Sequence, residues 1–84
     1  MKYQILFTEQ AKKDIKHLPA PIYARIIKAL EIISENPLLG KMLKGELRGL
    51  RSYRMGDYRI IYQVESRKII VIILKIGHRK DVYR

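Results

Sequence analysis

Two arginines flank a short turn in the second half of this 84-residue sequence. Residues 52–59 read Ser-Tyr-Arg-Met-Gly-Asp-Tyr-Arg, and glycine followed by a polar residue is typical of a two-residue type II′ hairpin turn. Because side chains alternate faces along a strand, this turn places Arg54 directly opposite Arg59, with Ser52 on the same face. Like charges so arranged repel each other, which favours an anion bound by both arginines. For either arginine alone, a solvated position on a sheet surface is the competing interpretation.

The end of the sequence carries the other residue types that can move protons or hold phosphate. Gly77 leads out of a long apolar segment into His78, Arg79 and Lys80, and Tyr83 follows shortly after. An imidazole, a guanidinium and a phenol at one strand end can supply proton transfer and phosphate stabilisation without a metal ion. The alternative is a frayed basic tail, because chain termini are usually disordered unless they dock.

Three strands are expected to position these groups. They are predicted at about Leu50–Met55, Tyr58–Glu65 and Lys68–Ile76. The apolar run Ile69–Leu74 lacks alternation, which predicts a central strand with both faces at least partly covered.

Two helices are predicted before these strands. Alternation over residues 3–7 indicates a short opening strand, and Thr8 can then cap a first helix that ends near Leu18. Pro21 suits the first turn of a second helix, which Asn36-Pro37 stops. The predicted fold is therefore α+β: an N-terminal strand and an antiparallel helix hairpin packed on a roughly four-stranded, mainly antiparallel sheet. We expect one domain spanning residues 1–84.

Composition restricts the classes of partner. Eighteen Lys and Arg against eight Asp and Glu give a net charge of +10, which attracts nucleic acid, anionic membranes or acidic proteins. Cysteine is absent and there are two histidines, so we expect neither a disulfide nor a metal site, and no cofactor. The longest apolar run, six residues, is far short of the roughly 20 needed to span a membrane. We expect a soluble cytoplasmic protein with no membrane partner.

Two motifs and the order of elements resemble a known family. Residues 50–62 read Leu-Arg-Ser-Tyr-Arg-Met-Gly-Asp-Tyr-Arg-Ile-Ile-Tyr, and residues 77–83 read Gly-His-Arg-Lys-Asp-Val-Tyr. This combination resembles the RelE/ParE toxin superfamily, most of all its RelE branch, and the likeness covers essentially the whole chain.

The resemblance implies a toxin of a type II toxin–antitoxin system. Toxins of the RelE type are mRNA interferases: they enter the ribosomal A site and cut the exposed codon without a metal ion. The ribose 2′-hydroxyl attacks the adjacent phosphorus, which leaves a 2′,3′-cyclic phosphate and a 5′-hydroxyl. The implied partners are the ribosome with its mRNA, and a cognate RelB-like antitoxin that is acidic and folds on binding.

The resemblance also implies roles for individual residues. Arg54 and Arg59 would hold the scissile phosphate, and Arg79 would stabilise its growing charge or the leaving oxygen. Tyr83 would stack on the base or orient it. His78 would act as an acid or a base. Relatives often carry a basic residue where this chain has Ser52, and Arg51 or Lys44 can take that place if the strand contains a bulge. The expected RNA contacts are Arg51, Lys44, Ser52 and Lys80.

Two other functions remain open from the sequence. A ParE-type toxin shares the fold but inhibits DNA gyrase and needs no catalytic set, and the basic, aromatic ending favours RNA cleavage over it. A non-catalytic module that binds RNA and blocks translation would use the charge for affinity alone.

Overall fold

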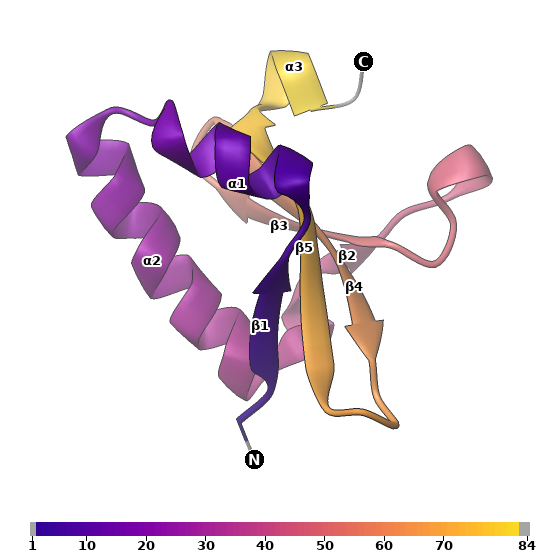
Figure 1. Cartoon of the computed structure of the whole chain (residues 1–84). Coiled ribbons are helices and arrows are strands. Elements are labelled where there is room, and N and C mark those ends of the chain that lie inside the picture. The colour runs from indigo at the N-terminus through magenta and orange to yellow at the C-terminus, as the bar shows by residue number, and fades with distance from the viewer. Residues whose placement is uncertain (1, 83–84) are drawn as a thin grey trace.

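The structure is a computed structural model that describes the backbone of residues 2–82 and the side chains of residues 2–80. The regular elements are β1 (Gln4–Phe7), α1 (Glu9–Lys16), α2 (Ala20–Glu35), β2 (Lys41–Met42), β3 (Arg51–Met55), β4 (Tyr58–Glu65), β5 (Ile70–His78) and α3 (Arg79–Val82), with short 3-10 turns η1 (Pro37–Leu39) and η2 (Gly45–Leu47). The strands form one five-stranded sheet in the order β1-β5-β4-β3-β2, and α1 and α2 lie against one of its faces (Figure 1).

The predicted α+β fold is confirmed. The sheet is mainly antiparallel, with β1 and β5 as its parallel pair. Strand β5 lies inside the sheet, between β1 and β4, as its apolar sequence predicts. The helices form a hairpin whose arms diverge in Figure 1. The strand count differs from the prediction, because the loop after α2 contributes the two-residue edge strand β2, which pairs with β3.

Both helices begin where the sequence predicts, for identifiable reasons. Thr8 Oγ1 accepts a hydrogen bond from Ala11 N (3.1 Å) and so caps α1. Pro21 stands in the first turn of α2, where its missing N–H costs nothing, and α2 ends at Glu35 before Asn36 and Pro37. No helix in the described part of the chain is long and apolar enough to cross a membrane.

The core lies between the helices and one face of the sheet. Helix α2 presents Ile26, Ala29, Leu30 and Ile33 to the strands, and the strand side chains that meet them include Ile60, Tyr62, Val71 and Ile73. We call this side of the sheet the helix face and the opposite side the far face. Burial of this apolar surface supplies the main stabilisation of the fold.

A β-bulge in β5 decides which residues reach the far face. Tyr62 pairs with Ile73 but the preceding Ile61 pairs with Lys75, so Leu74 is an extra residue on β5. Before the bulge Val71 and Ile73 face the helices; after it Ile76 and His78 do, while Lys75 and Gly77 turn to the far face.

Helix α1 satisfies the backbone groups at this bulge. Thr8 Oγ1 donates to Leu74 O (3.0 Å), and Asp14 Oδ2 accepts from Ile76 N (2.9 Å). Strand β5 also extends to His78, two residues beyond the predicted end, and α3 follows directly. Through residue 82 the tail is therefore ordered secondary structure and not a frayed end.

Candidate functional site

The β3–β4 turn has the predicted geometry. Gly56 has a φ of 59°, whereas Asp57 is not among the positive-φ residues, which fits a type II′ turn. Met55 pairs with Tyr58 and Arg54 pairs with Arg59, as the alternation predicts.

The two arginines converge on one backbone oxygen. Arg54 Nε donates to Gly56 O at 3.4 Å, and Arg59 Nη1 donates to the same oxygen at 3.2 Å and to Tyr58 O at 3.1 Å. Arg54 is exposed and Arg59 is half-buried. Two guanidinium groups that share an acceptor are close enough to bind one phosphate together.

These charges have no carboxylate partner among the side chains of residues 2–80. The one ion pair found there is Lys12 with Glu9, whose Nζ and Oε1 atoms are 3.4 Å apart on α1. Within that described part, no carboxylate neutralises the arginine pair.

Arg79 is tied to the same turn through its backbone. Its N–H donates to Asp57 O at 2.7 Å, which fixes the start of α3 beside the hairpin, and its side chain is exposed. Lys80 is the next exposed cation along α3. We call Arg54, Arg59 and Arg79 the arginine cluster. Tyr83, the predicted base-stacking residue, lies outside the described residues.

His78 points to the other side of the sheet. It pairs with Tyr58 across the strands, and the two rings meet edge to face, with centroids 5.7 Å apart and planes at 73°. Its Nδ1 accepts a hydrogen bond from Lys80 N at 3.3 Å. The structure thus does not bring the imidazole together with the side chains of Arg54 and Arg59, which lie on the far face.

Arg51 lies on the helix face at the opposite end of β3. Its Nη1 donates to Leu38 O (3.3 Å) and Gly40 O (2.8 Å), so it holds the segment after α2 in place. The β3–β4 pairing is regular from Arg51 to Met55, so the bulge that would turn Arg51 toward the arginine cluster is absent from this strand pair.

Ser52 and Lys44 have different surroundings. Ser52 is 8% exposed on the far face, two residues before Arg54. Lys44 is exposed in the loop just before η2. A basic side chain nevertheless reaches the neighbourhood of Ser52, because exposed Lys41 of β2 is its cross-strand partner.

Three cations near the arginine cluster escaped the sequence-based prediction. Lys41 arrives through strand β2, and Lys75 reaches the far face because of the bulge, diagonal to Arg59. Arg25 extends from α2, with Nη2 3.5 Å from where a Cβ on Gly56 would stand. None shares a motif with the turn, so only the three-dimensional arrangement reveals them.

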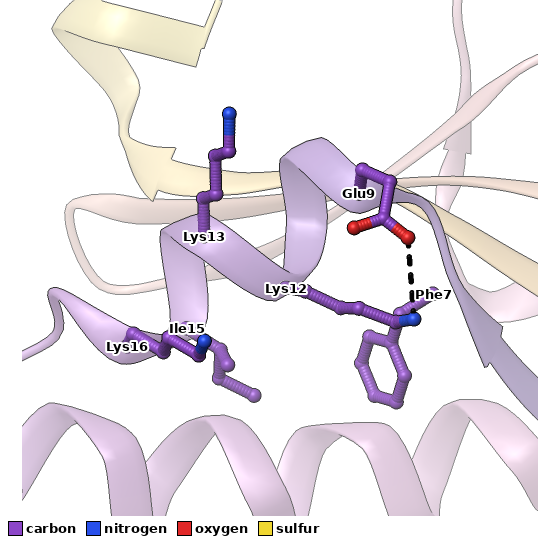
Figure 2. Close-up of a pocket in the computed structure, with 6 residues that line it drawn as sticks. All are labelled: Phe7, Glu9, Lys12, Lys13, Ile15 and Lys16. Atoms are coloured by element: carbon purple, nitrogen blue, oxygen red, sulfur yellow. Dashed lines mark hydrogen bonds and ion pairs between the residues drawn. The ribbon is translucent and has the colours of Figure 1, made fainter.

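A separate hollow between α1 and α2 carries lysines but lies apart from the cluster. Figure 2 shows Phe7 and Ile15 directed toward α2, with Lys12 bonded to Glu9 beside them. Its volume is about 330 Å³. Among the side chains of residues 2–80, no group of three or more His, Cys, Asp or Glu is placed to hold a metal ion.

Comparisons with known proteins identify the family. The model of the ParE toxin of the type II toxin–antitoxin system parDE matches residues 5–83. Toxin RelG of Mycobacterium tuberculosis is 40% identical over 86 residues, which cover 100% of this chain and 99% of that protein. The chain belongs to the RelE/ParE family of toxins.

Further relatives of the family agree in sequence and in structure. The mRNA interferase toxin RelE of Escherichia coli K12 is 29% identical over 90 residues, covering 99% of this chain and 92% of that protein. The crystal structure of the toxin–antitoxin complex RelBE2 from Mycobacterium tuberculosis contains a similar chain, with a TM-score of 0.89 and 36% identity, and the match covers 96% of this chain and 95% of that one.

Proposed function

We propose that this chain is a RelE-type mRNA interferase that cleaves codons in the ribosomal A site, acting as one cytoplasmic domain of residues 1–84. The observation that carries the proposal is the pair Arg54 and Arg59, which share the Gly56 carbonyl and have no carboxylate partner among the described side chains. The similarity to a protein named mRNA interferase supports it.

The proposed reaction needs charge stabilisation more than any other contribution. The 2′-oxygen forms a bond to phosphorus, the bond from phosphorus to the 5′-oxygen breaks, and the proton of the 2′-hydroxyl ends on that leaving oxygen. Negative charge builds on the phosphate oxygens, where Arg54 and Arg59 would neutralise it. Arg79 would stabilise the same charge or the leaving oxygen, and Tyr83 would orient the base.

The position of His78 suggests a different role from proton transfer at this phosphate. Its ring packs with Tyr58 on the helix face, whereas the phosphate would sit on the far face. We therefore assign His78 to substrate binding in this proposal. Lys41 and Lys75, on the far face, would add contacts to the RNA backbone.

The proposed partners follow from the same charge. Similar chains occur in toxin–antitoxin complexes such as RelBE2, so we propose a RelB-like antitoxin that neutralises this toxin. The ribosome and its mRNA would supply the polyanionic surface that the free toxin binds.

A reconstituted translation system tests cleavage directly. Wild-type protein is expected to produce cuts inside A-site codons, mapped by primer extension, and an Arg59→Ala, Arg79→Ala double variant is expected to reduce the rate by at least about 100-fold. The matched control is Arg67→Ala, Lys68→Ala, which removes two exposed positive charges at the other end of β4 and should cleave like wild type. Intact transcripts with all three proteins would reject the proposal.

Gyrase inhibition is the second candidate, because the matching family model carries the ParE description. If no transcript is cut, the same preparations are assayed for inhibition of DNA supercoiling by gyrase. Inhibition without cleavage would establish a ParE-type toxin. Ribosome binding without either activity would establish a non-catalytic translation blocker.

A further inference from the structure

A cleft on the helix face lies at the same end of the sheet as the arginine cluster. Its volume is about 470 Å³, within the range of small-ligand sites. One wall is the end of α1, with Lys13 and His17, and the other is the cross-strand pair Tyr58 and His78. None of these side chains packs as part of the central core.

The aromatic wall leaves ring surface available. Tyr58 and His78 are half-buried and meet at 73°, so they do not stack face on face with each other. A flat ring can therefore lie on one of them. Nucleobases bind proteins in this way in single-stranded RNA recognition.

The two histidines have complementary tautomers. His17 Nδ1 is 2.7 Å from Lys13 O, which can only accept, so Nδ1 carries the proton and Nε2 of the neutral ring is an acceptor. His78 Nδ1 accepts from Lys80 N, so its neutral ring carries the proton on Nε2 and donates there. One acceptor and one donor are what the hydrogen-bonding edge of a base requires.

The charged side chains that line the cleft do not favour a phosphate over a base. Asp14 lines the cleft, and its two oxygens accept from Gln10 Nε2 (2.8 Å) and Ile76 N (2.9 Å). Its negative charge offsets the positive charge of Lys13, which lines the same cleft, so the lining offers no net attraction for a phosphate group.

The cleft and the cluster are joined through the chain. Tyr58 directly precedes Arg59, and His78 directly precedes Arg79. Gly77, the cross-strand partner of Arg59, has no side chain and also borders the cleft. The cleft and the arginine cluster therefore lie on opposite faces of the sheet at the same end. One RNA chain can pass around this end and contact both.

We propose that this cleft binds the nucleobase next to the scissile phosphate, stacked on the Tyr58 and His78 pair and hydrogen-bonded by His17 and His78. The proposal rests on the RNA-cleaving function proposed above. Because the histidines offer one donor and one acceptor, every base can satisfy them, and the cleft would position RNA without strong base selectivity.

Binding of 2′-O-methyl trinucleotides, which cannot be cleaved, tests the cleft. Fluorescence anisotropy compares an intact trinucleotide with versions that lack the first or the last base but keep every phosphate. For wild-type protein, removal of one of these bases should weaken binding about tenfold. For Tyr58→Leu, the intact RNA should already bind about tenfold more weakly, and removing that base should make no further difference.

Two further variants complete the design. Tyr23→Leu replaces an exposed tyrosine on α2 and should keep the wild-type sensitivity to base removal. His17→Ala, at an exposed position, should lose part of that sensitivity and gives a second measurement if Tyr58→Leu does not fold.

The outcomes separate the cleft from the proposed function. If Tyr58→Leu and His17→Ala both lose as much affinity as wild type when a base is removed, base binding in the cleft is rejected. The proposed role of the arginine cluster would then still stand. Wild-type binding that does not respond to removal of either base would also overturn the cleft alone. Intact transcripts with wild-type protein in the translation assay would overturn the RNA-cleaving function and the cleft with it.

Discussion

At the scale of single residues, Tyr62 shows how one buried polar group organises the approach to the site. Its side chain is fully buried, its hydroxyl donates to Pro37 O (2.7 Å), and it accepts from Gly40 N (2.9 Å). A Cβ at Gly40 would overlap this hydroxyl, so glycine is required there. These bonds hold the segment that leads into β2 and its Lys41.

Burial raises the pKa of Tyr62 above its ordinary value of 10.0, although the hydrogen bond from Gly40 and the charge of Arg51 act in the opposite direction. A raised pKa means that the folded state favours the neutral phenol. Its contribution to stability is therefore complete below pH 10 and is lost as the pH rises through the folded-state value.

We expect Tyr62→Phe to lower the free energy of unfolding by about 1–3 kcal/mol near pH 8, because two buried backbone groups lose their partner. The difference in the free energy of unfolding between wild type and Tyr62→Phe should become smaller as the pH rises above 10. Urea unfolding followed by circular dichroism at pH 8 and pH 11 measures both effects. If the difference in the free energy of unfolding between wild type and Tyr62→Phe stays the same at pH 8 and pH 11, the raised pKa of Tyr62 in the folded state is contradicted.

At the scale of elements, helix α1 sets the register of the strand end that carries the site. Thr8 caps the helix and also donates to the bulge at Leu74, while Asp14 accepts from Ile76 N. The helix thus satisfies backbone groups that the bulge removes from the ladder. The far-face position of Lys75 depends on these contacts.

Replacing Thr8 by valine should lower the free energy of unfolding by about 1–2 kcal/mol, because the helix loses its cap and Leu74 loses a donor. Thr8→Ser keeps the hydroxyl and should stay within about 0.5 kcal/mol of wild type. Urea denaturation of the three proteins at one pH makes the comparison. Equal stability of the valine and serine variants would show that the hydroxyl does not support the bulge.

At the scale of the whole molecule, uncompensated positive charge is the dominant feature. The sequence has a net charge of +10, and the side chains of residues 2–80 form one ion pair between them. Lysines also border the hollow between α1 and α2 (Figure 2). Such a surface attracts polyanions over a Debye length, which is about 10 Å at 0.1 M salt.

A cognate antitoxin is therefore expected to be acidic and to gain helix when it binds. Circular dichroism of the mixture should exceed the sum of the separate spectra in helical signal. Raising the salt from about 50 to 200 mM should weaken binding about tenfold, measured by titration calorimetry. A peptide of the same composition in scrambled order is the control. Binding without helix gain or salt dependence would contradict this expectation.

The sequence alone determined the features that depend on neighbouring residues. The Gly56-Asp57 turn, the opposition of Arg54 and Arg59 and the cap at Thr8 follow from local backbone preference and the two-residue period of a strand. The charge and the motif at residues 77–83 indicated the family in the same way.

Only the tertiary structure decided which face His78 and Lys75 occupy. The run Ile69–Leu74 is apolar without alternation, so no periodic signal marks an extra residue there. The contacts that hold the bulge join residues 66 and 62 positions apart, from α1 to β5. Because a slip of one residue exchanges the two faces of a strand, those distant contacts place Lys75 beside the arginines and turn His78 into the cleft.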